Sequence, residues 1–266
     1  MIMTIGDVAR IIEDFAPLSL QESYDNSGLV VGRAGDELRG GILLAVDVTE
    51  AVVDEAVALG CGMIVTHHPI IFHPLKRLNS ASVVERCVER AIKNDIALYA
   101  CHTNLDSVRG GMSWCVGGML GLRDMAVLQP SGREYGGEAG FGVVGVLPEP
   151  VPVGEFMAKI RSVFGVEVIR HSAIVRDTVS KVALCTGAGA SLMEEARASG
   201  CDIYITADLK YNDFFAPSGE FVVADIGHYE SEFCAIRILF DVLSKKITNF
   251  ALHKSAHSEN PVHYCL

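Results

Sequence analysis

The sequence has no Cys-X-X-Cys pair, no long apolar run and comparatively few basic residues. Its eight cysteines are scattered over 266 residues, which argues against a zinc ribbon or a disulfide scaffold and favours buried thiols in a reducing compartment. No apolar stretch approaches the roughly 20 residues that a membrane span needs. With 22 Lys and Arg against 33 Asp and Glu, the formal net charge is −11, which weighs against general nucleic-acid binding.

The N-terminal stretch also lacks a basic segment followed by an apolar one, so we expect no signal peptide, no membrane association and a cytoplasmic protein. Half of the residues are hydrophobic and 21% are charged, as in folded globular proteins. An anionic small-molecule substrate would need local help from a metal ion or from a few placed cations, because the protein is acidic overall.

Apolar runs and amphipathic segments alternate along the chain. The pattern predicts three helices and three strands in the first part: helices over 4–15, 49–60 and 82–96, and strands over 41–48, 61–66 and 97–103. Thr4 and Thr49 are the expected N-caps of the first two helices. Strand, helix and strand in repetition indicate an α/β fold.

The later half repeats this pattern. Residues 43–70 align with 183–210, so that Leu184 lies 140 positions after Leu44 and Thr206 lies 140 positions after Thr66. We therefore predict two related α/β lobes, 1–124 and 125–266, with a dinuclear metal site in the cleft between them. His67 and His68 align with Ala207 and Asp208, so the scaffold does not require histidines there.

Histidines and carboxylates follow the predicted strands, where open α/β sheets place their ligands. His67 and His68 follow the run ending at Thr66, and Pro69 restricts the chain directly behind them. His102 comes four residues before Asp106, and His228 four residues before Glu232. We regard these two pairs as equivalent positions of the two lobes, with His228 and Glu232 on one face of a helical turn.

This residue set predicts a metal centre. The expected ligands are His67, His68, Asp106, His228 and Glu232. Imidazole nitrogen with carboxylate oxygen suits zinc, iron, manganese or nickel, and is poor for calcium. Five ligands are too many for one structural zinc, so we expect two divalent ions bridged by a carboxylate, with the adjacent histidines facing different ions.

The ordered motifs THHP, HTNLD and GHYESE, with YDNSGLVVG near the N-terminus, resemble the Nif-three-like dinuclear metal-centre proteins, also described as GTP cyclohydrolase I type 2 homologues. The resemblance covers essentially the whole chain. It implies two α/β lobes, two metals at the cleft, Glu232 as the bridging carboxylate and a toroidal homohexamer. Tyr24 stands where the family often has tryptophan, and the chain is too short for the domain that longer members insert.

Other candidate residues have alternative explanations. His102 could bind metal, accept a proton or orient Asp106 through a hydrogen bond, and we favour the last two roles. His73 and Lys76 could be acid-base and anion-binding groups, or merely parts of an exposed loop. Asp25 is expected in a turn that positions the cleft. The segment 186–191, TGAGAS, is either a phosphate cradle or a plain turn, and we favour the turn.

The ligand set predicts a hydrolase in which a metal-activated water attacks the substrate. The resemblance points to GTP, with attack at C8, ring opening and loss of formate, and with His102 or His73 moving the proton. The alternative is a non-catalytic, metal-dependent regulatory ring that binds protein partners. A third reading is metal storage or chaperoning.

Overall fold

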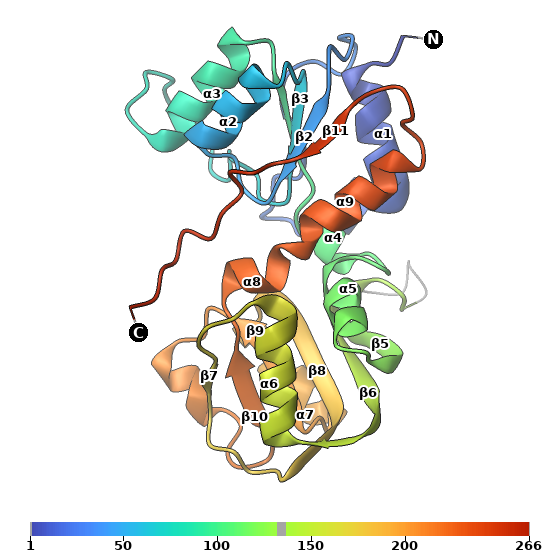
Figure 1. The fold of residues 1–266 in the computed structure, drawn as a ribbon, viewed down its shortest axis with the longest axis vertical. Helices are drawn as coiled ribbons and strands as arrows, with labels where there is room; N and C mark the ends of the chain where they lie inside the picture. The colour runs from blue at the N-terminus through green and yellow to red at the C-terminus, as the bar shows by residue number, and fades with distance from the viewer. Residues whose placement is uncertain (1, 132–136, 266) are drawn as a thin grey trace. The chain divides into compact units, whose positions relative to one another are not determined.

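The computed structural model describes residues 2–131 and 137–265, and the chain divides into two compact units (Figure 1). The first unit runs to Leu105 and includes Ala235–Glu259; the second comprises Asp106–Cys234 and the residues from Asn260 onward. Each unit has its own sheet with helices packed on it, which confirms the predicted α/β class.

The first unit contains a five-stranded sheet. Its strand order is β1 (Gly28–Val31), β4 (Ala97–Ala100), β3 (Met63–Thr66), β2 (Ile42–Ala45) and β11 (Leu252–Lys254). Strand β1 runs antiparallel to β4, and the other neighbours are parallel. All residues of β2, β3 and β4 are buried, as expected for parallel strands that are covered on both faces.

Helices cover both faces of this sheet. They are α1 (Ile5–Phe15), α2 (Glu50–Ala58), α3 (Val83–Lys93) and α9 (Cys234–Ser244), with a short 3-10 turn at Leu18–Leu20. Helices α2 and α3 lie on one face, and α1 and α9 on the other (Figure 1). Both predicted N-caps are confirmed: Thr4 accepts a hydrogen bond from the N–H of Asp7, and Thr49 accepts one from Val52.

The second unit contains a six-stranded mixed sheet. Its order is β5 (Arg123–Pro130), β6 (Gly140–Pro152), β8 (Thr178–Ala188), β9 (Ile203–Ala207), β10 (Val222–Asp225) and β7 (Arg170–His171). Strands β8, β9 and β10 are parallel, whereas the outer pairings are antiparallel.

The helices of the second unit range in length from one turn to 12 residues. They are α4 (Thr103–Ser107, which starts in the first unit), α5 (Met112–Met119), α6 (Val153–Phe164), α7 (Met193–Ser199) and α8 (His228–Glu232), with 3-10 turns at Ala190–Leu192 and Tyr211–Phe215. Ala183 and Cys185 of β8 pack with Met193 and Ala196 of α7 in one hydrophobic cluster. Helix α6 lies across the sheet in Figure 1.

The predicted internal repeat is present in the strand register. Ile42 pairs with Met63 in the first unit, and Val182 pairs with Ile203 in the second. Both residues of the second pair lie 140 positions after their counterparts. The parallel β-α-β core was therefore built twice with the same spacing.

The domain division differs from the predicted boundary at 124/125. The first unit ends at Leu105, and the segment Ala235–Glu259 returns to it. The cause is strand β11, which pairs in parallel with β2 and extends the first sheet. Three residues with little alternation gave no strand signal in the sequence, so this return could not be predicted.

Six of the eight cysteines are buried, as expected; Cys115 is partly buried and Cys265 is exposed. Within the described ranges, no helix is both long enough and apolar enough to cross a lipid bilayer.

The returning strand provides a test of the domain division. The N–H of Ser255 donates to the carbonyl of Leu44 at 2.8 Å. We predict that Ser255→Pro, which removes this donor, destabilises the first unit by about 3 kcal/mol. Hydrogen exchange should show lost protection in β2 and unchanged protection in β8 and β9. Ser255→Ala keeps the N–H and is the matched control. Equal loss of protection in both units would contradict the division.

Candidate functional site

The two adjacent histidines lie directly after β3, which ends at Thr66. The N–H of His68 donates to the carbonyl of Val46, and the Thr66 hydroxyl donates to the carbonyl of His68 at 2.8 Å. These bonds fix the main chain just beyond the strand. One ring nitrogen each of His67, His68 and His102 lies within 4.8 Å of the other two, so the first unit alone brings three imidazoles together.

Each of these imidazoles is held at Nδ1 by an oxygen acceptor of the same unit. The pairs are His67 with the Cys101 carbonyl at 2.9 Å, His68 with Asp47 at 2.8 Å and His102 with Asp25 at 2.8 Å. An acceptor at Nδ1 places the proton there and makes Nε2 the ring nitrogen that a metal takes. This pattern is typical of metal-binding histidines.

The Asp25 carboxylate behind His102 is fully buried. It accepts hydrogen bonds from Ser27 Oγ at 2.8 Å, and from both the N–H and the hydroxyl of Thr103. Burial raises its pKa, but the hydrogen bonds from His102, Thr103 and Ser27 outweigh burial and hold the pKa of Asp25 well below its usual value. His102 thus donates from Nδ1 to Asp25, and not to Asp106 as the sequence had suggested.

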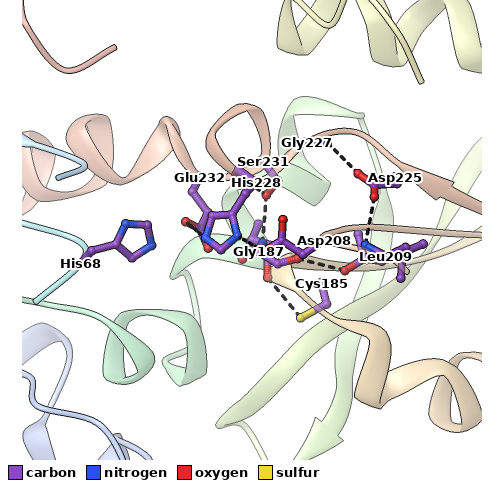
Figure 2. A network of polar contacts seen from close by, with 12 residues as sticks. His68, Cys185, Gly187, Asp208, Leu209, Asp225, Gly227, His228, Ser231 and Glu232 are labelled. Atoms are coloured by element: carbon purple, nitrogen blue, oxygen red, sulfur yellow. Dashed lines mark hydrogen bonds and ion pairs between the residues drawn. The ribbon is translucent and has the colours of Figure 1, made fainter. Parts of the chain in front are cut away.

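The other three predicted ligands lie in the second unit. His228 Nε2 lies 3.0 Å from Glu232 Oε2, and one carboxylate oxygen of Asp106 lies within 4.8 Å of one of Glu232. The Glu232 side chain is 4% exposed. His228 Nδ1 lies 2.8 Å from Asp208, so this fourth histidine also has a carboxylate at Nδ1 (Figure 2). The Glu232 carboxylate therefore lies close to both Asp106 and His228, and all three residues are predicted ligands.

The strand register shows that His102 and His228 are not at equivalent positions of the two units, contrary to the prediction. Ala100 and Asp225 both pair with the final threonine of the preceding strand, Thr66 and Thr206 respectively. His102 follows two residues after Ala100, whereas His228 follows three residues after Asp225. The two histidines thus differ by one position, and the equal spacing to Asp106 and Glu232 does not make them structural equivalents.

A hydrogen bond from Gly187 links the end of strand β8 to helix α8. The N–H of Gly187 donates to Ser231 Oγ, and the Ser231 hydroxyl donates to the carbonyl of His228 (Figure 2). Gly187 has φ +63°, and a Cβ there would lie 2.3 Å from Glu232 Oε1. The segment TGAGAS is not the plain turn that we favoured: its first three residues are the end of strand β8, and residues 190–192 form a 3-10 turn. Gly187 makes room for the Glu232 carboxylate.

Asp225 fixes the other end of α8. Its carboxylate accepts hydrogen bonds from the N–H groups of Leu209 and Gly227, each at 3.0 Å (Figure 2). It also forms an ion pair with Arg170. Gly227, the residue before α8, has φ +87°. This buried carboxylate thus joins the ends of β9 and β10 to the start of the helix that carries His228 and Glu232.

The protonation of His228 depends on its carboxylate neighbours. Burial alone would lower its pKa, but the hydrogen bonds and charges of Glu232 and Asp208 outweigh burial and raise the pKa of His228 to about 9. The Cys185 thiol nearby stays protonated, because burial and the carboxylates of Asp106 and Glu232 raise its pKa strongly.

The structure does not bring every predicted residue to these groups. His73 and Lys76 are exposed, and His73 belongs to none of the potential metal-binding groups in the described part of the chain. Sequence reasoning missed Asp47 and Asp208, the acceptors for His68 and His228. Both aspartates follow a strand that lies next to the strand preceding the histidine. This position is the sequence signal that could have identified them.

The residues present fit a divalent metal. Four imidazoles are fixed at Nδ1, three of them by carboxylates, and two further carboxylates lie close to one another in the second unit. Such a donor set suits zinc, iron, manganese or nickel. The fold and the ligand groups define an α/β protein of two units, each of which presents side chains that could hold a metal ion.

Sequence comparison identifies the family within this class of α/β proteins. The profile of the family DUF34/NIF3 (NGG1p interacting factor 3) matches residues 3–261, and the chain belongs to this family. It is 36% identical over 232 residues to the "GTP cyclohydrolase 1 type 2 homolog" of Clostridium perfringens, covering 86% of this chain and 87% of that protein. It is 34% identical over 256 residues to the protein of the same name from Clostridium acetobutylicum, covering 96% and 92%.

Solved structures show the same fold. The crystal structure of a Bacillus cereus protein related to NIF3 superposes with a TM-score of 0.90 at 24% sequence identity, covering 100% of both chains. The profile match and the two relatives confirm the family resemblance seen in the motifs, and the solved structure confirms the fold.

Gly187 provides a test of the α8 arrangement. We predict that Gly187→Ala lowers the affinity for divalent metal by about 10–100-fold, because the added Cβ displaces Glu232. Gly200→Ala is the matched control. Gly200 has φ +67°, and an added Cβ would have no atom within 4 Å, so this variant shares the backbone strain without the clash. Calorimetric titration of metal-stripped protein measures the effect. Equal losses in both variants would show that strain alone is responsible.

The raised pKa of His228 predicts pH-dependent metal binding. In metal-free protein, the protonated imidazole contributes stability that is complete below its unfolded pKa near 6.5 and is lost as the pH rises through about 9. Metal binding at Nε2 must displace this proton, so affinity should increase from pH 7 to about pH 9. Asp208→Asn should move the increase to lower pH. Calorimetry in two buffers of different ionisation enthalpy counts the released protons; no release at pH 7.5 would contradict the assignment.

Proposed function

We propose that this chain is a divalent-metal-dependent hydrolase that acts on a nucleotide, with GTP as the leading candidate substrate. The observation that carries the proposal is the group of three imidazole nitrogens, from His67, His68 and His102, within 4.8 Å of one another. Each of these rings also has an acceptor at Nδ1, as metal-ligating histidines have. Family membership supports the same conclusion, since relatives at 36% and 34% identity are named GTP cyclohydrolase 1 type 2 homolog.

We propose five residues as ligands of two ions: His67, His68, Asp106, His228 and Glu232. Bound divalent ions would supply a water of lowered pKa as nucleophile and would offset the negative charge of nucleotide phosphates. Glu232 is the proposed bridging ligand, because its carboxylate lies beside both Asp106 and His228. Asp47 and Asp208 orient the imidazoles of His68 and His228 and keep their protons on Nδ1.

His102 is proposed as the group that moves the proton. Its Nδ1 proton is held by the buried Asp25 carboxylate, so proton uptake and release occur at Nε2. Asp25 also stabilises the positive charge that His102 carries when protonated, because its own pKa stays low. His73, exposed on its loop, remains a weaker candidate for the same task.

The decisive assay is formate release from GTP. Metal-stripped protein reconstituted with zinc, manganese or iron(II) should release formate, and Glu232→Gln should lose the activity together with metal. Glu155→Gln, an exposed carboxylate on α6, is the matched control and should retain both. Metal retention without formate under any metal would reject GTP as substrate and would favour a regulatory protein that binds partners.

The role of His102 has its own test. We predict that His102→Gln lowers the rate of formate release by about 10²–10⁴-fold while the number of bound metals per chain is unchanged. Elemental analysis of the purified variant measures the metal content. Loss of one metal equivalent would make His102 a ligand and not the acid-base group.

We also propose assembly into a homohexamer. Light scattering should then give a mass of six times the 28.6 kDa chain, and a monomer at micromolar concentration would contradict this part of the proposal.

A further inference from the structure

A cavity lies within the second unit, and none of the proposed metal ligands lines it. Its volume is about 450 Å³, and it lies between the end of α6, helix α8 and the C-terminal segment. Four aromatic residues line it: Phe164, Tyr229, Phe233 and Tyr264. Cavities that bind small molecules span roughly 300–1,000 Å³ and are mostly apolar, with a few placed polar groups.

The most unusual group in this cavity is the carboxylate of Glu230. The residue is only 9% exposed, and Oε1 accepts one hydrogen bond from Asn260 Nδ2 at 2.9 Å. Among the described residues, no lysine, arginine or histidine forms an ion pair with Glu230. A buried carboxylate without a cation is costly, so a positive ligand would be strongly favoured beside it.

The electrostatic environment of the cavity is negative. Glu167 also lines it, and neither lysine nor arginine does. Burial and the carboxylates of Glu230, Asp225 and Glu167 raise the pKa of the Tyr264 phenol against the opposing charge of Arg170. The aromatic faces add to this field, because the face of an aromatic ring is its negative side.

We propose that this cavity binds an organic cation through an alkylammonium group, with the nitrogen beside Glu230 and the alkyl groups against the aromatic side chains. Aromatic rings around a carboxylate match the chemistry of ammonium recognition. A hard metal ion is a poor occupant, because calcium and magnesium require about six oxygen ligands and the described residues that line the cavity offer only the two carboxylates of Glu167 and Glu230 beside the aromatic side chains.

This site is distinct from the proposed metal ligands, although both use α8. His228 and Glu232 lie one helical turn apart on one face of α8, whereas Tyr229 and Glu230 occupy other positions around the same turn. The inference does not depend on the proposed hydrolase activity. A negative formate assay would leave it unchanged.

Binding of choline, compared with its neutral isostere 3,3-dimethylbutan-1-ol, tests the proposal on the full chain. The two probes have the same shape and differ in charge. Calorimetry or ligand-observed NMR at pH 8 should give a choline affinity at least about 10-fold above that of the alcohol. Sodium chloride and magnesium chloride at matched ionic strength should not displace choline. Equal affinity for the two probes, or displacement by magnesium, would overturn the proposal.

Two variants connect this binding to the cavity. Glu230→Gln keeps the shape and the acceptor for Asn260, and should weaken choline binding by about 10-fold or more. Tyr264→Leu, in the exposed C-terminal segment, should weaken binding without any loss of folding. The controls are Glu155→Gln on α6 and Tyr211→Leu, whose ring is 78% exposed elsewhere in the unit. Choline affinity that is unchanged in both test variants would place the bound cation elsewhere and reject the site.

Discussion

The arrangement of the candidate site depends on one interaction, the hydrogen bond at Nδ1 of each of its four histidines. An imidazole can rotate and can carry its proton on either nitrogen, so a strand end alone does not orient it. Asp47, Asp25 and Asp208 remove that freedom for His68, His102 and His228, and the Cys101 carbonyl does so for His67. Every one of these acceptors lies in the same unit as its histidine, so each imidazole is oriented by contacts within its own unit.

The repeated scaffold carries different chemistry in its two copies. In the first unit, the position after β3 bears two histidines; in the second, the matching positions are Ala207 and Asp208, and Asp208 orients a histidine from another element. Gly187, near the end of β8, has no side chain, and this lets the Glu232 carboxylate of α8 lie against the backbone of that strand. One β-α-β core thus carries different histidines and carboxylates at the strand ends of its two copies.

Much of this could be read from the sequence. Caps at Thr4 and Thr49, the alternation of strands and helices, and the 140-residue repeat all follow from local propensity and hydrophobic period, which neighbouring residues determine. The spacing of His228 and Glu232 placed them on one helical turn for the same reason. The family resemblance followed from motifs that are short but ordered.

The remaining features depended on contacts between residues far apart in the chain. Strand β11 acquires its identity only by pairing with β2, some 200 positions away, and this pairing assigns the C-terminal segment to the first unit. Asp25 meets His102 across 77 positions, and Asp225 meets Arg170 across 55. The sequence by itself therefore determined the α/β class, the repeat and the residue types of the ligands. Only the tertiary structure decided which acceptor orients each histidine, because such partners are chosen by proximity in space and leave no periodic signal along the chain.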